Sequence, residues 1–321
     1  MWGRAAPILV ALLALAALAT LTACGGGGET PTAVETEELE GEATPTPTAE
    51  GPTPAAEEES VQVDESYWHA GFKVTLGEAR LTAGDFGILG VEIEAVFENL
   101  SDADATPDST LVLQSGGQNY TESTLDQEIP QVPGGLSSNG LITFQVDEAF
   151  SFDDAVLVVG LPSNNQAMVP LTPGAGELVS LEPQEIAASG SATAGAVTVT
   201  LAGAEVRADL TEKHSEEEEG KLALRVFFSA MPVAGIQVGQ GVLQNGNVAL
   251  KLPDGTSVAV RSDGISGVNE ILQGKEGTTI TDLSARFDVP SPAAGEYSFI
   301  IKGKYGPGGA QVEAEAPFTV P

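Results

Sequence analysis

The sequence predicts an all-β protein whose folded part consists of two tandem β-sandwich domains after a disordered stalk. Three observations lead to this prediction. From Val61 onward, apolar and polar residues alternate in short runs interrupted by Gly, Pro, Asn and Asp, as in half-buried strands joined by turns. No stretch of this region keeps a helical period. The same order of strand-like runs also occurs twice along the chain.

Residues 1–23 have the layout of a secretory signal peptide. Arg4 supplies a basic start, and residues 8–21 form an apolar run shorter than the about 20 residues that a membrane-spanning helix needs. The sequence LTAC that ends at Cys24 resembles the lipobox of bacterial lipoproteins. That resemblance implies cleavage before Cys24, acyl chains on its thiol and amine, and lipid anchoring on the extracytoplasmic side of the cell membrane. The alternative is a secreted protein with one unpaired thiol.

Residues 24–60 comprise the lipidated cysteine and an acidic linker rich in Pro, Thr and Glu. After Cys24 this segment contains ten acidic residues and no Lys, Arg or aromatic residue. It cannot bury enough apolar surface to offset the entropy of ordering, so we expect it to be disordered. Its Thr-Pro repeats and its self-repelling charges favour an extended tether.

The first folded domain is expected over residues 61–184. Its clearest strands are the alternating or continuous apolar runs at residues 72–76, 91–97, 141–146 and 155–159.

The second domain is expected over residues 185–321, because the runs of the first domain recur there in the same order. Residues 72–81 align with 197–206, and 95–99 with 225–229. The further matches are 111–120 with 247–258, 140–146 with 282–289 and 155–160 with 297–303. The offset grows along the chain, as duplication followed by loop insertion would produce. Each half is long enough for one sandwich core.

The first domain resembles a known family through four motifs: FKVTLGEARL at residues 72–81, VEIEAVFENLSDAD at 91–104, LQSGGQNY at 113–120 and PGGLSSNGLITFQV at 133–146. Together they are similar to the secreted immunoglobulin-like (telokin-like) bacterial domains of unknown function, related to a mycobacterial immunoprotective extracellular antigen. The resemblance implies an immunoglobulin-like sandwich outside the cytoplasm and supplies no catalytic residues. The second domain departs from the pattern through its acidic insert EKHSEEEEG.

The formal net charge of −33 is unevenly distributed, because Lys73 and Arg80 are the only basic residues of the first domain. This charge excludes nucleic acid as a partner and disfavours adsorption to anionic lipid beyond the acyl anchor. Solubility is the simplest explanation for it, and a cationic partner or divalent cations are the alternative.

Two acidic segments are candidate metal sites. Asp102, Asp104 and Asp108 lie in one predicted loop, where alternating oxygen ligands could bind Ca²⁺, although a solvated turn is the more usual explanation of such a cluster. The insert at residues 212–220 places His214 beside Glu216 to Glu219. A run of like charges is typical of a disordered hairpin tip, and this interpretation is favoured over a weak metal site. Apart from Ca²⁺, no cofactor is predicted.

Tyr67, Trp68 and His69 form an aromatic cluster that opens the first domain. They could form a binding platform. The favoured interpretation is structural, with Trp68 closing one end of the core and His69 making a local hydrogen bond.

Enzyme chemistry has little support. The chain has only two histidines, no Gly-x-Ser-x-Gly motif, and a single cysteine that is assigned to lipid, which excludes Cys/His zinc sites. We therefore expect a membrane-anchored binding or scaffolding module, not an enzyme, with a protein partner outside the cytoplasm. The alternative is an envelope hydrolase or a small-ligand-binding lipoprotein with its site between the two domains.

Overall fold

The computed structural model describes residues 59–321 except 84–87, 124–126, 234, 237–240, 263–266, 291–293 and 306. The expected signal peptide, the lipidation site Cys24 and the linker up to residue 58 lie outside the described residues. Among the residues described, no helix is long and apolar enough to cross a membrane.

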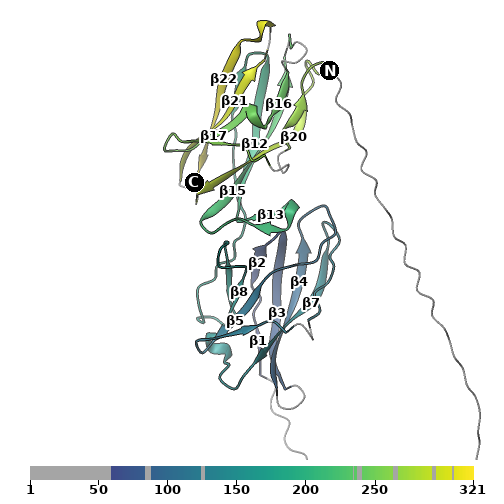
Figure 1. Ribbon diagram of the computed structural model, residues 1–321, viewed down its shortest axis with the longest axis vertical. Helices are drawn as coiled ribbons and strands as arrows, with labels where there is room; N and C mark the ends of the chain where they lie inside the picture. The colour runs from purple at the N-terminus through teal and green to yellow at the C-terminus, as the bar shows by residue number, and fades with distance from the viewer. Residues whose placement is uncertain are drawn as a thin grey trace, which may run out of the picture. The chain divides into compact units, whose positions relative to one another are not determined.

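The predicted all-β fold is confirmed (Figure 1). Residues 56–321 form one compact unit, within which buried apolar side chains gather into two separate clusters. The first cluster takes its residues from Val63 to Leu171 and the second from Ile186 to Val320. The two clusters are the cores of the two predicted sandwiches.

The first sandwich has two antiparallel sheets. One has the order β1-β3-β4-β7, with β2 also pairing with β3, and the other has the order β6-β5-β8-β9. The strands are β1 (Ser60–Gln62), β2 (Ser66–His69), β3 (Phe72–Ala83), β4 (Leu89–Asn99), β5 (Leu111–Ser115), β6 (Gln118–Thr121), β7 (Ser137–Val146), β8 (Val156–Val159) and β9 (Ala167–Pro170). The four strands expected from the sequence fall on β3, β4, β7 and β8. The 3-10 turn η2 (Phe152–Asp154) precedes β8.

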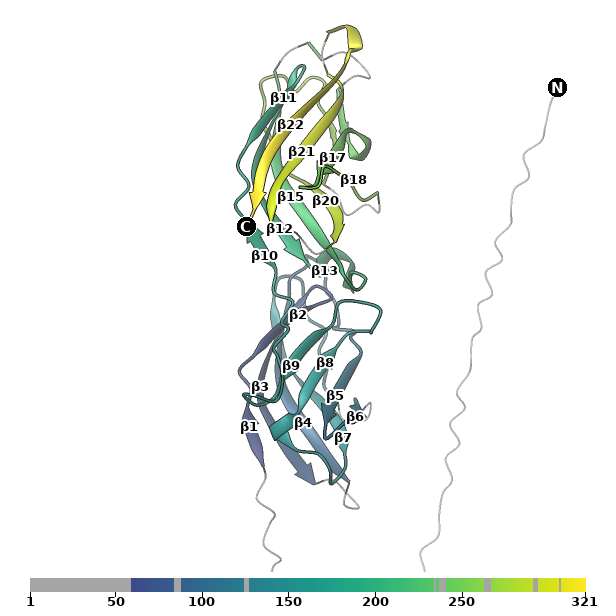
Figure 2. The same cartoon turned by 90° about the vertical axis from the view of Figure 1, so that its left-hand side faces the viewer.

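The second sandwich repeats this topology strand for strand. Its sheets have the orders β10-β12-β15-β20, with β11 also pairing with β12, and β18-β17-β21-β22 (Figures 1 and 2). The strands are β10 (Gln184–Ile186), β11 (Ser191–Ala194), β12 (Val197–Arg207), β15 (Lys221–Pro232), β17 (Val248–Lys251), β18 (Ser257–Ala259), β20 (Ile280–Pro290), β21 (Gly295–Lys304) and β22 (Gln311–Val320). Short elements add to this plan: a pair β16 (Val242–Gln244) with β19 (Asn269–Ile271), and the 3-10 turns η4 (Asn245–Asn247) and η5 (Pro307–Gly309).

A β-bulge occurs at the same place in both halves. The β3–β4 register shifts directly after Leu76, and the β12–β15 register shifts directly after Leu201. These two leucines are partners in the sequence alignment. A bulge adds one unpaired residue and increases the local twist of its strand. Its recurrence gives the duplication a structural signature that does not depend on side-chain similarity.

The likeness to immunoglobulin domains is one of architecture: two antiparallel sheets packed around one core. The strand order is distinct, because the consecutive long strands β3 and β4 pair in one sheet. In the constant-type immunoglobulin order the second and third strands belong to opposite sheets. The second sandwich makes the same choice with β12 and β15.

A hairpin between the two long strands of the second sandwich also distinguishes the two halves. It consists of β13 (Asp209–Leu210), the 3-10 turn η3 (Thr211–Lys213) and β14 (Ser215–Glu216), and lies between β12 and β15. In the first sandwich, β3 ends at Ala83 and β4 already begins at Leu89, so the connection there is much shorter. We call residues 209–220 the junction hairpin, because its side chains reach the first sandwich.

Candidate functional site

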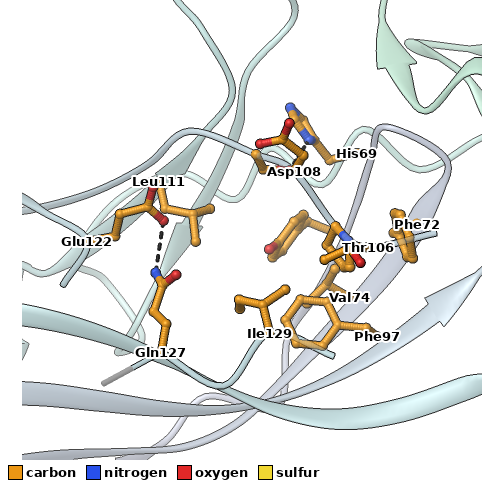
Figure 3. A pocket seen from close by; sticks show the side chains of 13 residues that line it. His69, Phe72, Val74, Phe97, Thr106, Asp108, Leu111, Glu122, Gln127 and Ile129 are labelled. Carbon is orange, nitrogen blue, oxygen red and sulfur yellow. Dashed lines mark hydrogen bonds between the residues drawn. The ribbon is translucent and has the colours of Figure 1, made fainter. Parts of the chain in front are cut away.

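A pocket of about 180 Å³ opens in the first sandwich at the end nearest β2 (Figure 3). Its apolar walls come from strands of both sheets and from the segment after β6, and consist of Tyr67, Phe72, Val74, Phe97, Leu111 and Ile129. Its polar rim comes mainly from the loop before β5 and the segment after β6. In Figure 3, Glu122 and Gln127 lie on one side, and Asp108 and His69 on another.

The Tyr67 phenol is a deeply buried polar group that lines this pocket. The side chain is 2% exposed, and its hydroxyl has no hydrogen-bond partner among the described residues. Burial raises the pKa of this phenol far above its ordinary value, so it stays neutral. The hydroxyl oxygen is not among the fully enclosed, unsatisfied polar atoms of the described residues, so it is open to the pocket and forms an unused polar contact within a mostly apolar site.

His69 connects the pocket to the second sandwich. Its Nδ1 lies 2.8 Å from Ser109 Oγ, and its Nε2 lies 3.0 Å from Oε1 of Glu216 on the junction hairpin. The imidazole is 2% exposed. Burial alone would raise the pKa of Glu216, but the His69 contact and the Asn164 amide hold it below its ordinary value. The Glu216 carboxylate is therefore charged at neutral pH and lies within ion-pair distance of Nε2, although the two groups are not aligned as a hydrogen bond.

Ser109, His69 and Glu216 have the residue types of a hydrolase triad, with the serine and the carboxylate on opposite ring nitrogens. The electrostatics of the pocket are unsuited to acyl transfer. Asp108 and Glu122 line it, while no described lining residue is Lys or Arg. A developing oxyanion needs hydrogen-bond donors or positive charge aimed at it, and these carboxylates would repel it.

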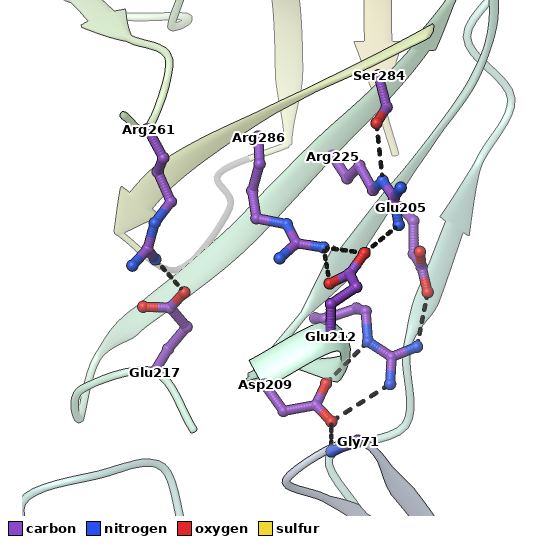
Figure 4. Close-up of polar contacts among 10 residues, drawn as sticks. Gly71, Glu205, Asp209, Glu212, Glu217, Arg225, Arg261, Ser284 and Arg286 are labelled. Atoms are coloured by element: carbon purple, nitrogen blue, oxygen red, sulfur yellow. Dashed lines mark hydrogen bonds and ion pairs between the residues drawn. The ribbon is translucent and has the colours of Figure 1, made fainter. Parts of the chain in front are cut away.

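The junction hairpin meets the first sandwich through buried polar contacts. The Asp209 carboxylate accepts the Gly71 backbone N–H at 2.6 Å (Figure 4). The His214 ring lies 5.4 Å from the Phe72 ring, its Nδ1 is 3.2 Å from the Ala70 carbonyl, and its Nε2 is 3.1 Å from Ser101 Oγ. Nδ1–H can donate to the carbonyl, whereas the Ser101 hydroxyl beside Nε2 also donates to Asn99 Oδ1 at 2.8 Å. Both histidines of the chain thus lie where the two sandwiches meet.

Backbone pairing continues the junction along residues 217–221. Asn165 N–H donates to the Glu217 carbonyl at 3.1 Å, and Glu219 N–H donates to the Ser163 carbonyl at 3.0 Å. The Asn165 side chain donates to the Lys221 carbonyl at 2.7 Å and accepts from Gly220 N–H at 3.2 Å. The amide of Asn165 is therefore held by the second sandwich, although it belongs to the first.

Arginines of the second sandwich hold the base of the hairpin (Figure 4). Arg207 donates to Asp209 and to Glu205, each at 2.8 Å. Arg286 is 2% exposed and donates to Glu212 Oε2 at 2.9 Å. Burial would raise the pKa of Glu212, yet the charge and hydrogen bond of Arg286 hold it below its ordinary value.

Glu217 behaves differently from its neighbours. Its side chain is 6% exposed and receives Arg261 Nη1, which also donates to Asp288. Burial raises the pKa of Glu217, and the nearby Asp288 charge adds to this effect, outweighing the attraction of Arg261. The junction thus holds one carboxyl with a raised pKa close to two with lowered pKa values.

The predicted Ca²⁺ ligands do not come together. Asp102, Asp104 and Asp108 are all exposed; Asp104 accepts the Gly134 N–H at 3.2 Å, and Asp108 lines the pocket. Within the described part of the chain, no three His, Cys, Asp or Glu side chains form a group that could hold a metal ion. Ca²⁺ binding stays a prediction.

Two structural interpretations from the sequence are wrong. The acidic insert is not a disordered tip; it is the ordered junction hairpin, whose Glu216 and Glu217 are largely buried. Trp68 does not close the core: it is half-buried, with the Lys73 ammonium 5.2 Å from its ring centroid, and Tyr67 fills the core instead. The hydrogen bond of His69 is not local either, because Ser109 is forty residues away.

In comparisons with known proteins, no protein-family model matches the chain. No curated protein sequence matches it significantly. The resemblance to secreted immunoglobulin-like domains therefore stays a prediction from the motifs.

Proposed function

We propose that this chain is a lipid-anchored extracytoplasmic protein that acts as a binding or scaffolding module for another protein. The lipobox-like sequence before Cys24 supports the anchor, and the acidic linker to residue 60 supports a tether between the membrane and the folded unit. The resemblance of the first sandwich to secreted domains supports the same setting.

The observation that carries the scaffolding role is the buried contact of Asp209 with the Gly71 backbone N–H. A flexible connection between two domains leaves both free to reorient, whereas a charged hydrogen bond of 2.6 Å in a buried site resists separation. With His69–Glu216 and the Asn165 contacts, it makes the two sandwiches a single arm. A rigid unit of this kind can hold a binding surface for a partner at a fixed position.

The anchor is tested by metabolic labelling of cells with radioactive palmitate. We expect label on the wild-type chain and none on Cys24→Ser, with the wild-type amino terminus at residue 24 by mass spectrometry. An unmodified amino terminus upstream of Cys24 would refute the anchor.

The binding role is tested by cross-linking the full chain in intact cells of its source. We expect a partner to be recovered at a reproducible stoichiometry, and recovery to fall for Asp209→Ala, which loosens the arm, but not for Asp153→Asn at an exposed turn. Recovery of no envelope component would count against a binding role.

A hydrolase is the second candidate, favoured by the Ser109–His69–Glu216 arrangement alone. A fluorophosphonate probe that labels activated serines decides between the two. The carboxylates that line the pocket predict no labelling. Labelling of the wild type that is lost in Ser109→Ala would establish the hydrolase instead.

A further inference from the structure

We infer that the pocket beside His69 binds an alkylammonium group on a short apolar stem, the chemistry of a lysine side chain. This inference rests on the proposed binding function for its biological meaning, and it specifies the chemical class of the group recognised. Three features support it: the charge of the pocket, its walls and the unpartnered Tyr67 hydroxyl.

The pocket has negative charge that the chain leaves unneutralised. Asp108 has no described ion-pair partner, and Glu122 receives only the Gln127 amide at 2.9 Å. The two basic residues of the first sandwich are engaged elsewhere. Lys73 lies over the Trp68 ring, and Arg80 pairs with Glu92 at 2.6 Å. A cation entering the pocket would therefore meet two carboxylates without competition from a neighbouring Lys or Arg.

The walls suit an aliphatic stem better than a hydrated ion. Phe72, Phe97 and Tyr67 supply aromatic surface, and Val74, Leu111 and Ile129 supply aliphatic surface. Aromatic faces attract alkylammonium groups through their quadrupole, and this attraction strengthens as water is removed. A metal ion would need six or more oxygen ligands, which these walls do not provide.

The Tyr67 hydroxyl supplies the polar contact inside the pocket. The Tyr67 side chain is 2% exposed, its hydroxyl is open to the pocket and has no hydrogen-bond partner among the described residues, so its oxygen can accept an N–H of the ammonium. His69 is not available for this role, because both of its ring nitrogens already face Ser109 and Glu216.

The volume also limits the ligand. At about 180 Å³ the pocket is smaller than the usual range for drug-sized ligands, so it suits a short stem. A free amine and a lysine side chain of a partner protein share this chemistry. They differ because the lysine also brings its peptide backbone, which the mouth of the pocket must accommodate.

The test is a titration of the purified full chain followed by amide chemical shifts of Ser109 and Leu111. Butylammonium represents the free amine, Nα-acetyl-lysine methylamide represents a lysine within a protein, and 1-pentanol is the uncharged control of similar size. We expect saturable shifts with the amines and clearly weaker binding of the alcohol. Binding of both amines points to a lysine side chain, and binding of butylammonium alone points to a free amine.

Variants localise the effect. Asp108→Asn combined with Glu122→Gln should weaken amine binding about tenfold, since two charge contacts are lost. Tyr67→Phe should weaken it as well while keeping the aromatic wall. Asp102→Asn, an exposed residue of the same loop that does not line the pocket, should leave it unchanged.

Equal binding of alcohol and amines, shifts confined to other residues, or affinity unchanged in the double variant would each overturn the inference. The titration does not depend on any cellular partner. If the chain binds no amine but a partner is still recovered from cells, this inference alone is wrong. If the chain binds amines but no partner is recovered from cells, the proposed function is wrong.

Discussion

Asp209 is the residue whose loss should cost the junction most. It is 3% exposed, accepts the Gly71 N–H, and pairs with Arg207. Asp209→Ala removes the acceptor of the buried Gly71 N–H and leaves Arg207 with Glu205 as its remaining carboxylate, so it should lower the free energy of unfolding by about 3 kcal/mol. Asp209→Asn keeps an acceptor for Gly71 and should cost less. Urea denaturation measures both, and Asp153→Asn should be neutral. A neutral Asp209→Ala would contradict the role given to this contact.

Gly71 is the partner of Asp209, and two separate constraints fix it. Its φ of +79° favours glycine, and a Cβ there would lie 2.7 Å from the Thr211 carbonyl oxygen of the hairpin. Gly117 is a matched control, with φ of +75° and no atom within 4 Å of the position that a Cβ would take. Gly117→Ala should cost about 1 kcal/mol from backbone strain alone. Gly71→Ala should cost clearly more, and equal losses in chemical denaturation would show that the hairpin yields to the added methyl group.

Single residues were the hardest level to predict from the sequence. In the run SYWH of β2, side chains alternate between faces, so only one of Tyr67 and Trp68 can enter the core. Composition favours burial of Trp, and the register of β2 against β3 selects Tyr67 and His69 instead. That register depends on how β2 pairs with Phe72 and Val74 of β3. The composition of the segment carries no information about this pairing. The lining residues of the pocket come from segments far apart in the sequence, and no local motif joins them.

At the scale of elements, alternation predicted the strands well, because each sandwich strand buries one face. The junction hairpin was missed for a physical reason. Its sequence is dominated by like charges, which favours disorder in isolation, and its order comes from partners distant in the sequence. Arg286 and Arg261 neutralise Glu212 and Glu217, and His69 contacts Glu216. The run of four acidic residues does not by itself predict an ordered hairpin, because the basic residues that face it are distant in the sequence.

The hairpin should couple the unfolding of the two cores. Each hydrogen bond between the sandwiches described above ends on residues 209–221. Replacing residues 209–220 with a short Gly-Ser turn removes all of them except the bond from Asn165 to the Lys221 carbonyl, and no residue of this segment belongs to either core cluster. We expect one calorimetric transition for the wild type and two for the shortened chain. A single transition that persists in the shortened chain would show that other contacts couple the domains.

At the scale of the whole molecule, the repeated order of strand-like runs predicted the duplicated topology, and the bulges after Leu76 and Leu201 agree with it. How the copies meet was not predictable from the repeat, because the contact depends on the one segment that the copies do not share. Duplication thus supplied the two cores, and the acidic insertion supplied the connection between them.

The same insertion should give the molecule a stability maximum in mildly acidic solution. Glu212 and Glu216 have lowered pKa values in the folded state, so they bind fewer protons than in the unfolded chain, where the ordinary value is 4.5. Their stabilisation is complete above about pH 4.5 and is lost as the pH falls through their folded pKa values. Glu217 has a raised pKa, so its contribution has the opposite sign, and stability is lost as the pH rises from about 4.5 through that value.

Urea denaturation across this pH range tests both sides of the maximum with separate variants. Glu216→Gln should flatten the acid side, because it removes one carboxylate that must be protonated during acid unfolding. Glu217→Gln should flatten the other side, because the amide removes the cost of a buried charge at neutral pH. Repulsion among the negative charges of the chain, whose formal net charge is −33, also weakens on acidification. Each variant changes this net charge by only one, so the repulsion is almost the same in both. The variants therefore separate the junction from the global charge, and identical pH profiles for both would refute the assignment to these two carboxyls.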